Sequence, residues 1–110
     1  MDPLEAFESL DVRVGTIIEA ERLAGLRKAA YKLVVDFGDG IGSKQSAAQI
    51  TDLYEPADLI GRQVLAVVNL PPKRMGPFIS EVLVLGVPDE ENRVILIAPD
   101  RPAENGKKMF

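Results

Sequence analysis

Residues 69–86 read NLPPKRMGPFISEVLVLG, and this stretch decides the fold class. Two consecutive prolines, Pro71 and Pro72, lack the N–H group that a central strand needs, so they separate one apolar run from the next. They are expected to place Lys73 and Arg74 on an exposed loop. A stiff basic turn between two strand candidates is typical of a β domain, and it indicates a contact surface rather than a catalytic centre.

Alternation of apolar and polar residues predicts further strands on the N-terminal side of this stretch. The first covers residues 12–20, in which Val12, Val14, Thr16, Ile18 and Ala20 are expected to share one face and Gly15 to mark a bulge or a sharp bend. The next covers residues 31–37, in which Tyr31, Leu33, Val35 and Phe37 share one face. The remaining predicted strands cover residues 41–46, 63–70, 81–87 and 94–98. The aliphatic runs at 63–70 and 81–87 predict cover on both faces.

Two short helices complete the predicted elements. Asp2 is a helix cap, Pro3 suits the first helical position, and Glu5 completes a capping box. On this N-terminal helix Leu4, Phe7 and Leu10 share one side. Because the helix is too short to be stable alone, that side is expected to dock on the barrel or on a second subunit. An internal helix is expected within residues 51–61.

Five or six short strands without regular helices between them favour a small closed barrel over a parallel α/β sheet. The length of 110 residues and the hydrophobic content of 46% fit one domain that covers residues 1–110. A domain of this size buries a limited fraction of its surface, so oligomerisation would stabilise it.

The composition excludes several classes of function. The chain has no cysteine and no histidine, which excludes disulfides, thiolate metal sites, Ser-His-Asp catalysis and Cys-His catalysis. We therefore expect no enzyme activity, no metal and no cofactor. The acidic N-terminus and the absence of a long apolar run predict a cytoplasmic protein without membrane insertion. The net charge of −4 weighs against a strong general affinity for nucleic acid.

The order and spacing of several motifs resemble the tRNA-binding OB-fold domain that is appended to methionyl- and phenylalanyl-tRNA synthetases. The motifs are Val12–Gly15, Lys32–Asp36, Leu59–Gly61, Val67–Leu70 and Lys73–Met75 followed by Ser80. The resemblance covers nearly the whole chain. It implies an all-β, five-stranded Greek-key barrel of the OB type, with a short internal helix and a short N-terminal helix.

A closer resemblance is to the CsaA chaperones, the free-standing bacterial members of this family, which are linked to protein secretion. It is carried by Lys44–Thr51, by Ala66–Asn69 with the two prolines, and by Ser80–Gly86. It implies a homodimer in which the N-terminal helix, with Leu4, Phe7 and Leu10, and the C-terminal segment form the subunit contact.

One departure from the wider family concerns the residues after Ser80. The tRNA-binding members usually carry a small or polar residue, then Gly and Met, whereas this chain has Glu81, Val82 and Leu83. Glu81 places a negative charge where a phosphate or a base edge would approach. The departure therefore weakens the tRNA interpretation and favours the chaperone subgroup.

Nine residues are the candidates for contact with a peptide or RNA: Lys44, Gln45, Gln49, Asn69, Lys73, Arg74, Phe78, Ser80 and Glu81. Lys73 and Arg74 suit phosphates or acidic peptide groups, although a solvated turn would look the same. Phe78 suits stacking on a base or contact with an apolar side chain, and equally the edge of a core. A structural hydrogen bond explains Ser80 and Glu81 better than acyl transfer does.

The leading functional hypothesis is a chaperone that binds unfolded or export-precursor polypeptides in an apolar groove. Leu70, Met75, Phe78 and Ile79 are expected to supply this groove. The alternative is a tRNA-binding module with a basic band across the dimer. Salt dependence separates the two, because phosphate binding weakens steeply with salt and apolar binding does not.

Overall fold

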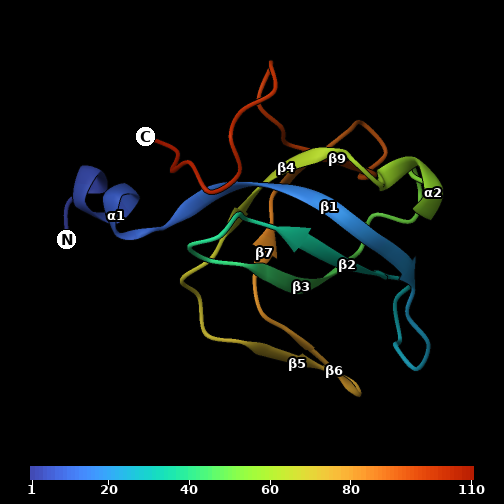
Figure 1. The fold of residues 1–110 in the computed structure, drawn as a ribbon. Coiled ribbons are helices and arrows are strands. Elements are labelled where there is room, and N and C mark those ends of the chain that lie inside the picture. The colour runs from blue at the N-terminus through green and yellow to red at the C-terminus, as the bar shows by residue number, and fades with distance from the viewer.

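The computed structural model describes all 110 residues, and strands dominate it (Figure 1). The elements are α1 (Pro3–Ser9), β1 (Val12–Arg22), β2 (Tyr31–Asp36), β3 (Ser43–Ala48), α2 (Pro56–Leu59), β4 (Gln63–Val67), β5 (Lys73–Met75), β6 (Phe78–Ser80), β7 (Leu83–Val84), β8 (Gly86–Pro88) and β9 (Val94–Leu96). Five strands form one antiparallel sheet in the order β3-β2-β1-β4-β7, and β5–β6 and β8–β9 form two separate hairpins. The sheet curls into a nearly closed barrel, which confirms the expected all-β OB-type fold.

Strand β1 is the longest strand and is shared along its length. Val12–Thr16 pair with β4, whereas Thr16–Arg22 pair with β2, so the sheet turns around this strand. The C-terminal segment bonds to the other edge of the first half of β1. The Val14 N–H donates to the Lys107 carbonyl over 3.0 Å, and the Met109 N–H donates to the Val12 carbonyl over 2.8 Å. Both chain ends therefore lie on the same side of the barrel (Figure 1).

Gly15 was expected to mark a bulge or a sharp bend, and no bulge lies there. The ladder is regular there, with Gly15 opposite Val64. The glycine is instead needed for a close approach in the core, because a Cβ at this position would lie 2.5 Å from a Val35 methyl and 2.8 Å from the Phe37 ring. Gly15 thus makes room for β2 to pack across the barrel.

The bulge in β1 lies three residues further on, between Ile17 and Glu19. Ile17 is fully buried, and Ile18 is exposed. The extra residue lets Ala20 pack against the core, where an uninterrupted alternation would place the Glu19 carboxylate. The predicted facing of this strand is therefore wrong beyond the bulge, at Glu19 and Ala20.

The core is built around β2, as its alternation predicted. Tyr31, Leu33, Val35 and Phe37 are all at most 1% exposed. They belong to one cluster of 11 buried residues that draws on β1, β2, β3, β4, the α2 region and Val82. The Tyr31 hydroxyl donates to the Tyr54 carbonyl over 2.6 Å, and this bond fastens the connection between β3 and β4 to the barrel.

Side chains complete the closure of the barrel between β3 and the chain that follows β6. The Glu81 N–H donates to the Gln45 carbonyl over 2.8 Å, and the Gln45 N–H donates to Glu81 Oε1 over 3.0 Å. The Ala47 N–H donates to Ser80 Oγ over 3.1 Å. We call these four residues, Gln45, Ala47, Ser80 and Glu81, the seam. It satisfies backbone groups on the edge of β3 that would otherwise lack a partner.

Two predicted elements after β4 differ in the structure. The loop expected at residues 71–74 leads directly into the β5–β6 hairpin, so Lys73 and Arg74 lie on a strand. The strand expected at residues 81–87 is split into β7 and β8 at Leu85, whose N–H bonds β4 at Leu65 and whose carbonyl accepts from Ile97. Cover on both faces was also wrong for this run, because Leu83 and Val87 are about half exposed.

The internal helix is limited to α2, a single turn. Pro56, which the sequence indicates as a possible first residue because it has no N–H group and a fixed φ, begins the helix, and residues 51–55 are not helical. Neither helix has the length and apolar composition of a membrane span.

Candidate binding groove

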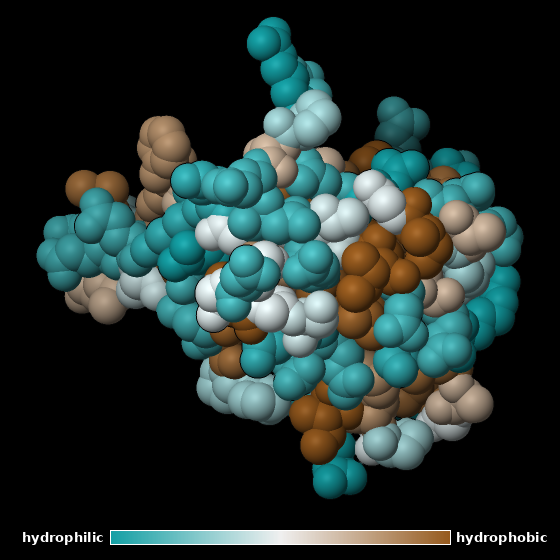
Figure 2. Space-filling model, viewed as in Figure 1, coloured by the Kyte–Doolittle hydropathy of each residue, from teal (hydrophilic) through white to brown (hydrophobic).

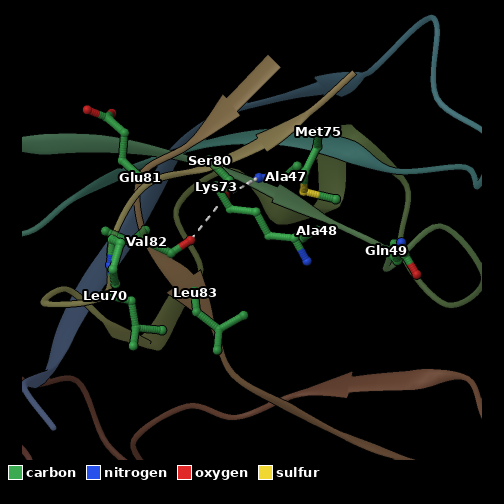
Figure 3. Close-up of a pocket in the computed structure, with 11 residues that line it drawn as sticks. Ala47, Ala48, Gln49, Leu70, Lys73, Met75, Ser80, Glu81, Val82 and Leu83 are labelled. Atoms are coloured by element: carbon green, nitrogen blue, oxygen red, sulfur yellow. Dashed lines mark hydrogen bonds between the residues drawn. The ribbon is translucent and has the colours of Figure 1, made fainter. Parts of the chain in front are cut away.

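A groove of about 570 Å³ opens between the end of β3, the β5–β6 hairpin and β7 (Figure 3). Its lining residues are Ala47, Ala48, Gln49, Leu70, Pro71, Lys73, Met75, Ser80, Glu81, Val82 and Leu83. Most of the lining surface is aliphatic or thioether. The groove is therefore suited to an apolar group, with a few polar atoms at its border.

The register of the hairpin decides which of its residues face the groove. Lys73 pairs with Ser80, and Arg74 pairs with Ile79. Because successive residues of a strand point to opposite faces, Lys73 and Met75 line the groove, whereas Arg74 and Ile79 point away from it. The structure thus separates two cations that the sequence places side by side.

Ser80 is buried and has a structural role, as expected. Its Oγ accepts from the Ala47 N–H over 3.1 Å and donates to the Val82 carbonyl over 3.2 Å (Figure 3). These bonds hold the groove wall that continues into Val82, which is 5% exposed. The Ser80 hydroxyl thus makes two hydrogen bonds within the protein and holds the wall of the groove that it lines.

Glu81 lies at the border of the groove, but its carboxylate is used elsewhere. Oε1 accepts from the Gln45 N–H over 3.0 Å, and Figure 3 shows the carboxylate pointing away from Lys73 and Leu83. The Gln45 side chain in turn donates from Nε2 to the Ile79 carbonyl over 2.8 Å. Gln45 and Glu81 therefore fasten the hairpin to β3.

Two other candidates lie away from the groove. Asn69 fastens α1: its Oδ1 accepts from the Asp11 N–H over 2.9 Å, and its Nδ2 donates to the Ser9 carbonyl over 2.9 Å. Lys44 pairs with Val35 and so lies on the opposite face of β3 from Gln45. Of the nine candidates, the structure brings Gln49, Lys73, Ser80 and Glu81 to the groove, while Phe78 does not line it.

Several lining residues were not predicted from the sequence, namely Ala47, Ala48, Pro71, Val82 and Leu83. Leu83 is 50% exposed although it stands in a run that looks like a buried strand, so no local pattern indicates its place in the groove. Leu70 and Met75 were expected to line a groove, and they do. Ile79 was expected there as well, but the hairpin register turns it outward.

Cations without a carboxylate partner gather around the hairpin. Of the 13 lysines and arginines, six are in ion pairs. The others are Arg27, Lys28, Lys44, Arg62, Lys73, Arg74 and Lys108. We call Arg27, Lys28, Lys73 and Arg74 the basic cluster. Arg27 and Lys28 were not among the predicted contact residues.

Contacts between the hairpin tip and the loop that joins β1 to β2 bring together the two segments that carry the basic cluster. A Cβ added to Gly76 would lie 2.9 Å from the Leu26 side chain, and one added to Gly25 would lie 3.7 Å from Pro77. Arg27 and Lys28 follow directly after this contact. In an acidic chain, four unpaired cations on two touching segments form a locally positive surface.

A second hollow, of about 680 Å³, lies between α1 and the C-terminal segment. It is lined by Leu4, Phe7, Glu8, Leu10, Lys108, Met109 and Phe110. The helix α1 buries none of its residues, and Figure 2 shows apolar atoms on the segment that projects from the barrel. The predicted interface residues are thus exposed around one hollow, and Asp2 caps the helix by accepting from the Glu5 N–H over 2.8 Å.

The barrel, the seam and the groove define a small OB-type binding domain. The sequence matches the family described as a putative tRNA binding domain over residues 12–108, and the chain belongs to that family. The methionine–tRNA ligase of Methanothrix thermoacetophila is 38% identical over 104 residues, which cover 94% of this chain and 15% of the ligase. The chain thus spans about 15% of the length of the curated relatives that it matches.

Two solved structures are similar over the whole chain. The chaperone CsaA from Bacillus anthracis str. Ames is 49% identical, with a TM-score of 0.93 and coverage of 100% of this chain and 99% of that one. The CsaA chaperone protein from Picrophilus torridus is 45% identical, with a TM-score of 0.93 and full coverage of both chains. The resemblance to the CsaA subgroup is therefore confirmed.

Proposed function

We propose that this protein is a non-catalytic chaperone that binds unfolded or export-precursor polypeptides in the groove between β3, the β5–β6 hairpin and β7. The observation that carries the proposal is the apolar lining of this groove beside the single free cation of Lys73. Similarity to the two CsaA chaperones along the whole chain supports it.

The lining suits an extended peptide with an apolar side chain. Leu70, Met75 and Leu83 expose aliphatic or thioether surface at the groove, and an unbranched methionine adapts to side chains of different shape. Burial of one leucine or phenylalanine side chain contributes about 1.5–3 kcal/mol of transfer free energy. One such anchor gives weak, reversible binding, which suits a chaperone that must release its client.

The test is the binding of a fluorescent apolar peptide and of an unfolded precursor to Leu83→Gln. The matched control is Ile60→Gln, because Ile60 is 51% exposed, Leu83 is 50% exposed, and Ile60 lies outside the groove. We expect the first variant to weaken binding at least about tenfold, which corresponds to about 1.4 kcal/mol, and the control to bind normally. Equal affinities for both variants would refute the groove as the binding site.

The second candidate function is tRNA binding, and the basic cluster favours it. Four unpaired cations on adjoining segments meet the first requirement for contact with a phosphate backbone. In OB folds, the loop between the first two strands and the loop before the last strand are the ones that bind nucleic acid, and the basic cluster lies on the corresponding segments. Titration with tRNA at several salt concentrations tests this candidate.

We further propose that the protein works as a cytoplasmic homodimer whose subunits meet at the hollow between α1 and the C-terminal segment. Leu4, Phe7 and Phe110 leave a large apolar area in contact with water in a single chain. A second copy that covers this area would stabilise a domain that is small for its surface.

A further inference from the structure

We infer that an RNA phosphate backbone and an apolar peptide exclude each other on this protein, because both use Lys73. The inference rests on the peptide-binding function proposed above and adds a mode of regulation to it. RNA that occupies the basic cluster would release a peptide from the groove, and a bound peptide would weaken RNA binding by the same factor.

Lys73 belongs to two surfaces at once. It lines the apolar groove, and no carboxylate pairs with its ammonium group. Figure 3 shows its side chain extending between Met75 and Leu83. Arg74, the next residue, is also unpaired but points to the opposite face of the hairpin. Lys73 is therefore the one member of the basic cluster whose occupation affects the groove directly.

Two further cations lie on the loop that touches the tip of the hairpin. Arg27 and Lys28 follow the loop segment that touches the tip of the hairpin at Gly76 and Pro77. A strand of RNA that runs from this tip along the groove side of the hairpin meets Lys73, whereas Arg74 lies on the opposite face.

A phosphate held by Lys73 is incompatible with an apolar occupant. Phosphate is strongly hydrated, and its burial against Leu83, Met75 and an apolar peptide side chain would remove that water without supplying hydrogen-bond donors. The two ligands therefore compete for the space above the lysine. They do not form a stable ternary complex.

Competition of this kind has a quantitative signature. The apparent dissociation constant of the peptide rises linearly with RNA concentration and reaches no plateau. At ten times the dissociation constant of the RNA, the increase is about elevenfold. If the two ligands instead bind to coupled sites that can be occupied together, the apparent dissociation constant of the peptide stops rising once RNA saturates its site. The total increase then equals the coupling factor.

The experiment is a titration of a fluorescent apolar peptide into the full chain at increasing concentrations of bulk tRNA and one fixed, low salt concentration. We expect a linear rise for the wild type. Lys73→Gln should give a plateau with both ligands bound, and Lys73→Arg, which keeps the charge, should restore the linear rise. Each variant is compared with its own peptide affinity in the absence of tRNA.

Arg74→Gln is the matched control, because it removes the neighbouring cation from the other face of the hairpin. Its curve should stay linear but require more tRNA. Two results for the wild type at saturating tRNA would overturn the inference, namely a plateau and an unchanged peptide affinity. A failure of tRNA to bind would overturn it as well. All three results would leave the proposed peptide function intact. A failure of the peptide to bind without tRNA would overturn both.

Discussion

Glu81 and Gln45 hold each other by two hydrogen bonds, one from backbone to backbone and one from backbone to side chain. The Glu81 N–H donates to the Gln45 carbonyl over 2.8 Å, and Glu81 Oε1 accepts from the Gln45 N–H over 3.0 Å. A single residue thus satisfies both the donor and the acceptor of a residue on the edge of β3. This pairing closes the barrel where no ladder partner is available for the Gln45 N–H.

We predict that Glu81→Ala destabilises the protein and that Glu81→Gln largely does not. The alanine leaves the Gln45 N–H without its acceptor in a half-buried position, which costs about 1–3 kcal/mol. The glutamine keeps an oxygen at the same place. Urea denaturation of both variants measures the difference, and amide exchange at Gln45 localises it. Equal stabilities for the two variants would show that the side-chain bond does not contribute to the seam.

We predict that Lys73→Ala combined with Arg74→Ala weakens tRNA binding and lowers its dependence on salt. The loss of about two phosphate contacts should reduce the slope of log K against log salt by roughly two units. The control is Arg101→Ala combined with Lys107→Ala, since both cations are exposed and already ion-paired. A slope that is unchanged by the first pair would mean that RNA does not bind at the hairpin.

We predict that Phe7→Ser shifts the protein from dimer to monomer without unfolding it. Phe7 lies at the apolar hollow, and α1 buries no residue in a single chain, so the barrel itself should persist. Loss of the phenylalanine removes about 1.5–3 kcal/mol of burial from each side of the interface. Light scattering reports the mass and circular dichroism the fold.

Leu53→Ser is the control for this interface, because Leu53 is 40% exposed, as against 42% for Phe7, and lies outside the hollow. Deletion of residues 1–10 should act as Phe7→Ser does, since it removes Leu4, Phe7 and Leu10 together. A fully stable dimer after this deletion would contradict the proposed interface.

We predict that the Asp89 carboxylate stabilises the β8–β9 hairpin at neutral pH and that this stabilisation is lost in acid. The Arg93 N–H donates to Asp89 Oδ1 over 2.8 Å, and this bond, with the Arg93 guanidinium and the Glu91 N–H, lowers the pKa of Asp89 below 3.8. The contribution is fully present above pH 3.8 and is lost as the pH falls through the lowered value. Asp89→Asn should therefore be less stable than the wild type at neutral pH, and the difference should shrink below pH 3.8.

Asp100→Asn is the comparison for this pH effect, because the Asp100 side chain is 96% exposed. Denaturation curves of the three proteins at several pH values carry out the test. A difference between wild type and Asp89→Asn that stays constant through the acid range would contradict the assignment.

The alternation of β2 was readable from the sequence because each of its apolar residues faces one core. The bulge at Ile18 could not be predicted from the sequence. It places Ala20 instead of Glu19 against the core, and that core is formed by strands that are distant in sequence. Pro71 and Pro72 correctly indicated a break in the chain. They gave no sign of the hairpin beyond them, whose pairing depends on Gly76 at a φ of +60°.

The residues of the candidate groove could likewise be predicted from the sequence only in part. Lys73 and Arg74 are adjacent in sequence, but only the hairpin register separates the cation of the groove from the cation of the outer face. Ser80 was readable as a structural hydrogen-bonding group because no base accompanies it. The second role of Glu81, as the partner of Gln45, depends on a contact between residues 36 positions apart, which no local pattern indicates.

The last prediction concerns the charge of Glu81. We predict that Glu81→Gln strengthens tRNA binding and leaves the binding of an apolar peptide equal or weaker. The glutamine keeps the acceptor for Gln45 and so keeps the groove wall, while the negative charge beside the hairpin is removed. At an effective dielectric constant near 20, a carboxylate about 4 Å from a phosphate costs on the order of 4 kcal/mol, and greater distance and solvent screening reduce this. A remainder of about 1.4 kcal/mol is a tenfold change in affinity.

Titration of both ligands against wild type and Glu81→Gln at one fixed salt concentration measures this effect. The control is Glu104→Gln, which removes a charge on the C-terminal segment, where Glu104 pairs with Lys107. A tRNA affinity that rises for Glu81→Gln and not for the control would mean that the carboxylate opposes a phosphate near the seam. An affinity that is unmoved or falls would mean that Glu81 serves only to close the barrel, and the departure from the tRNA-binding motif after Ser80 would then have a structural cause.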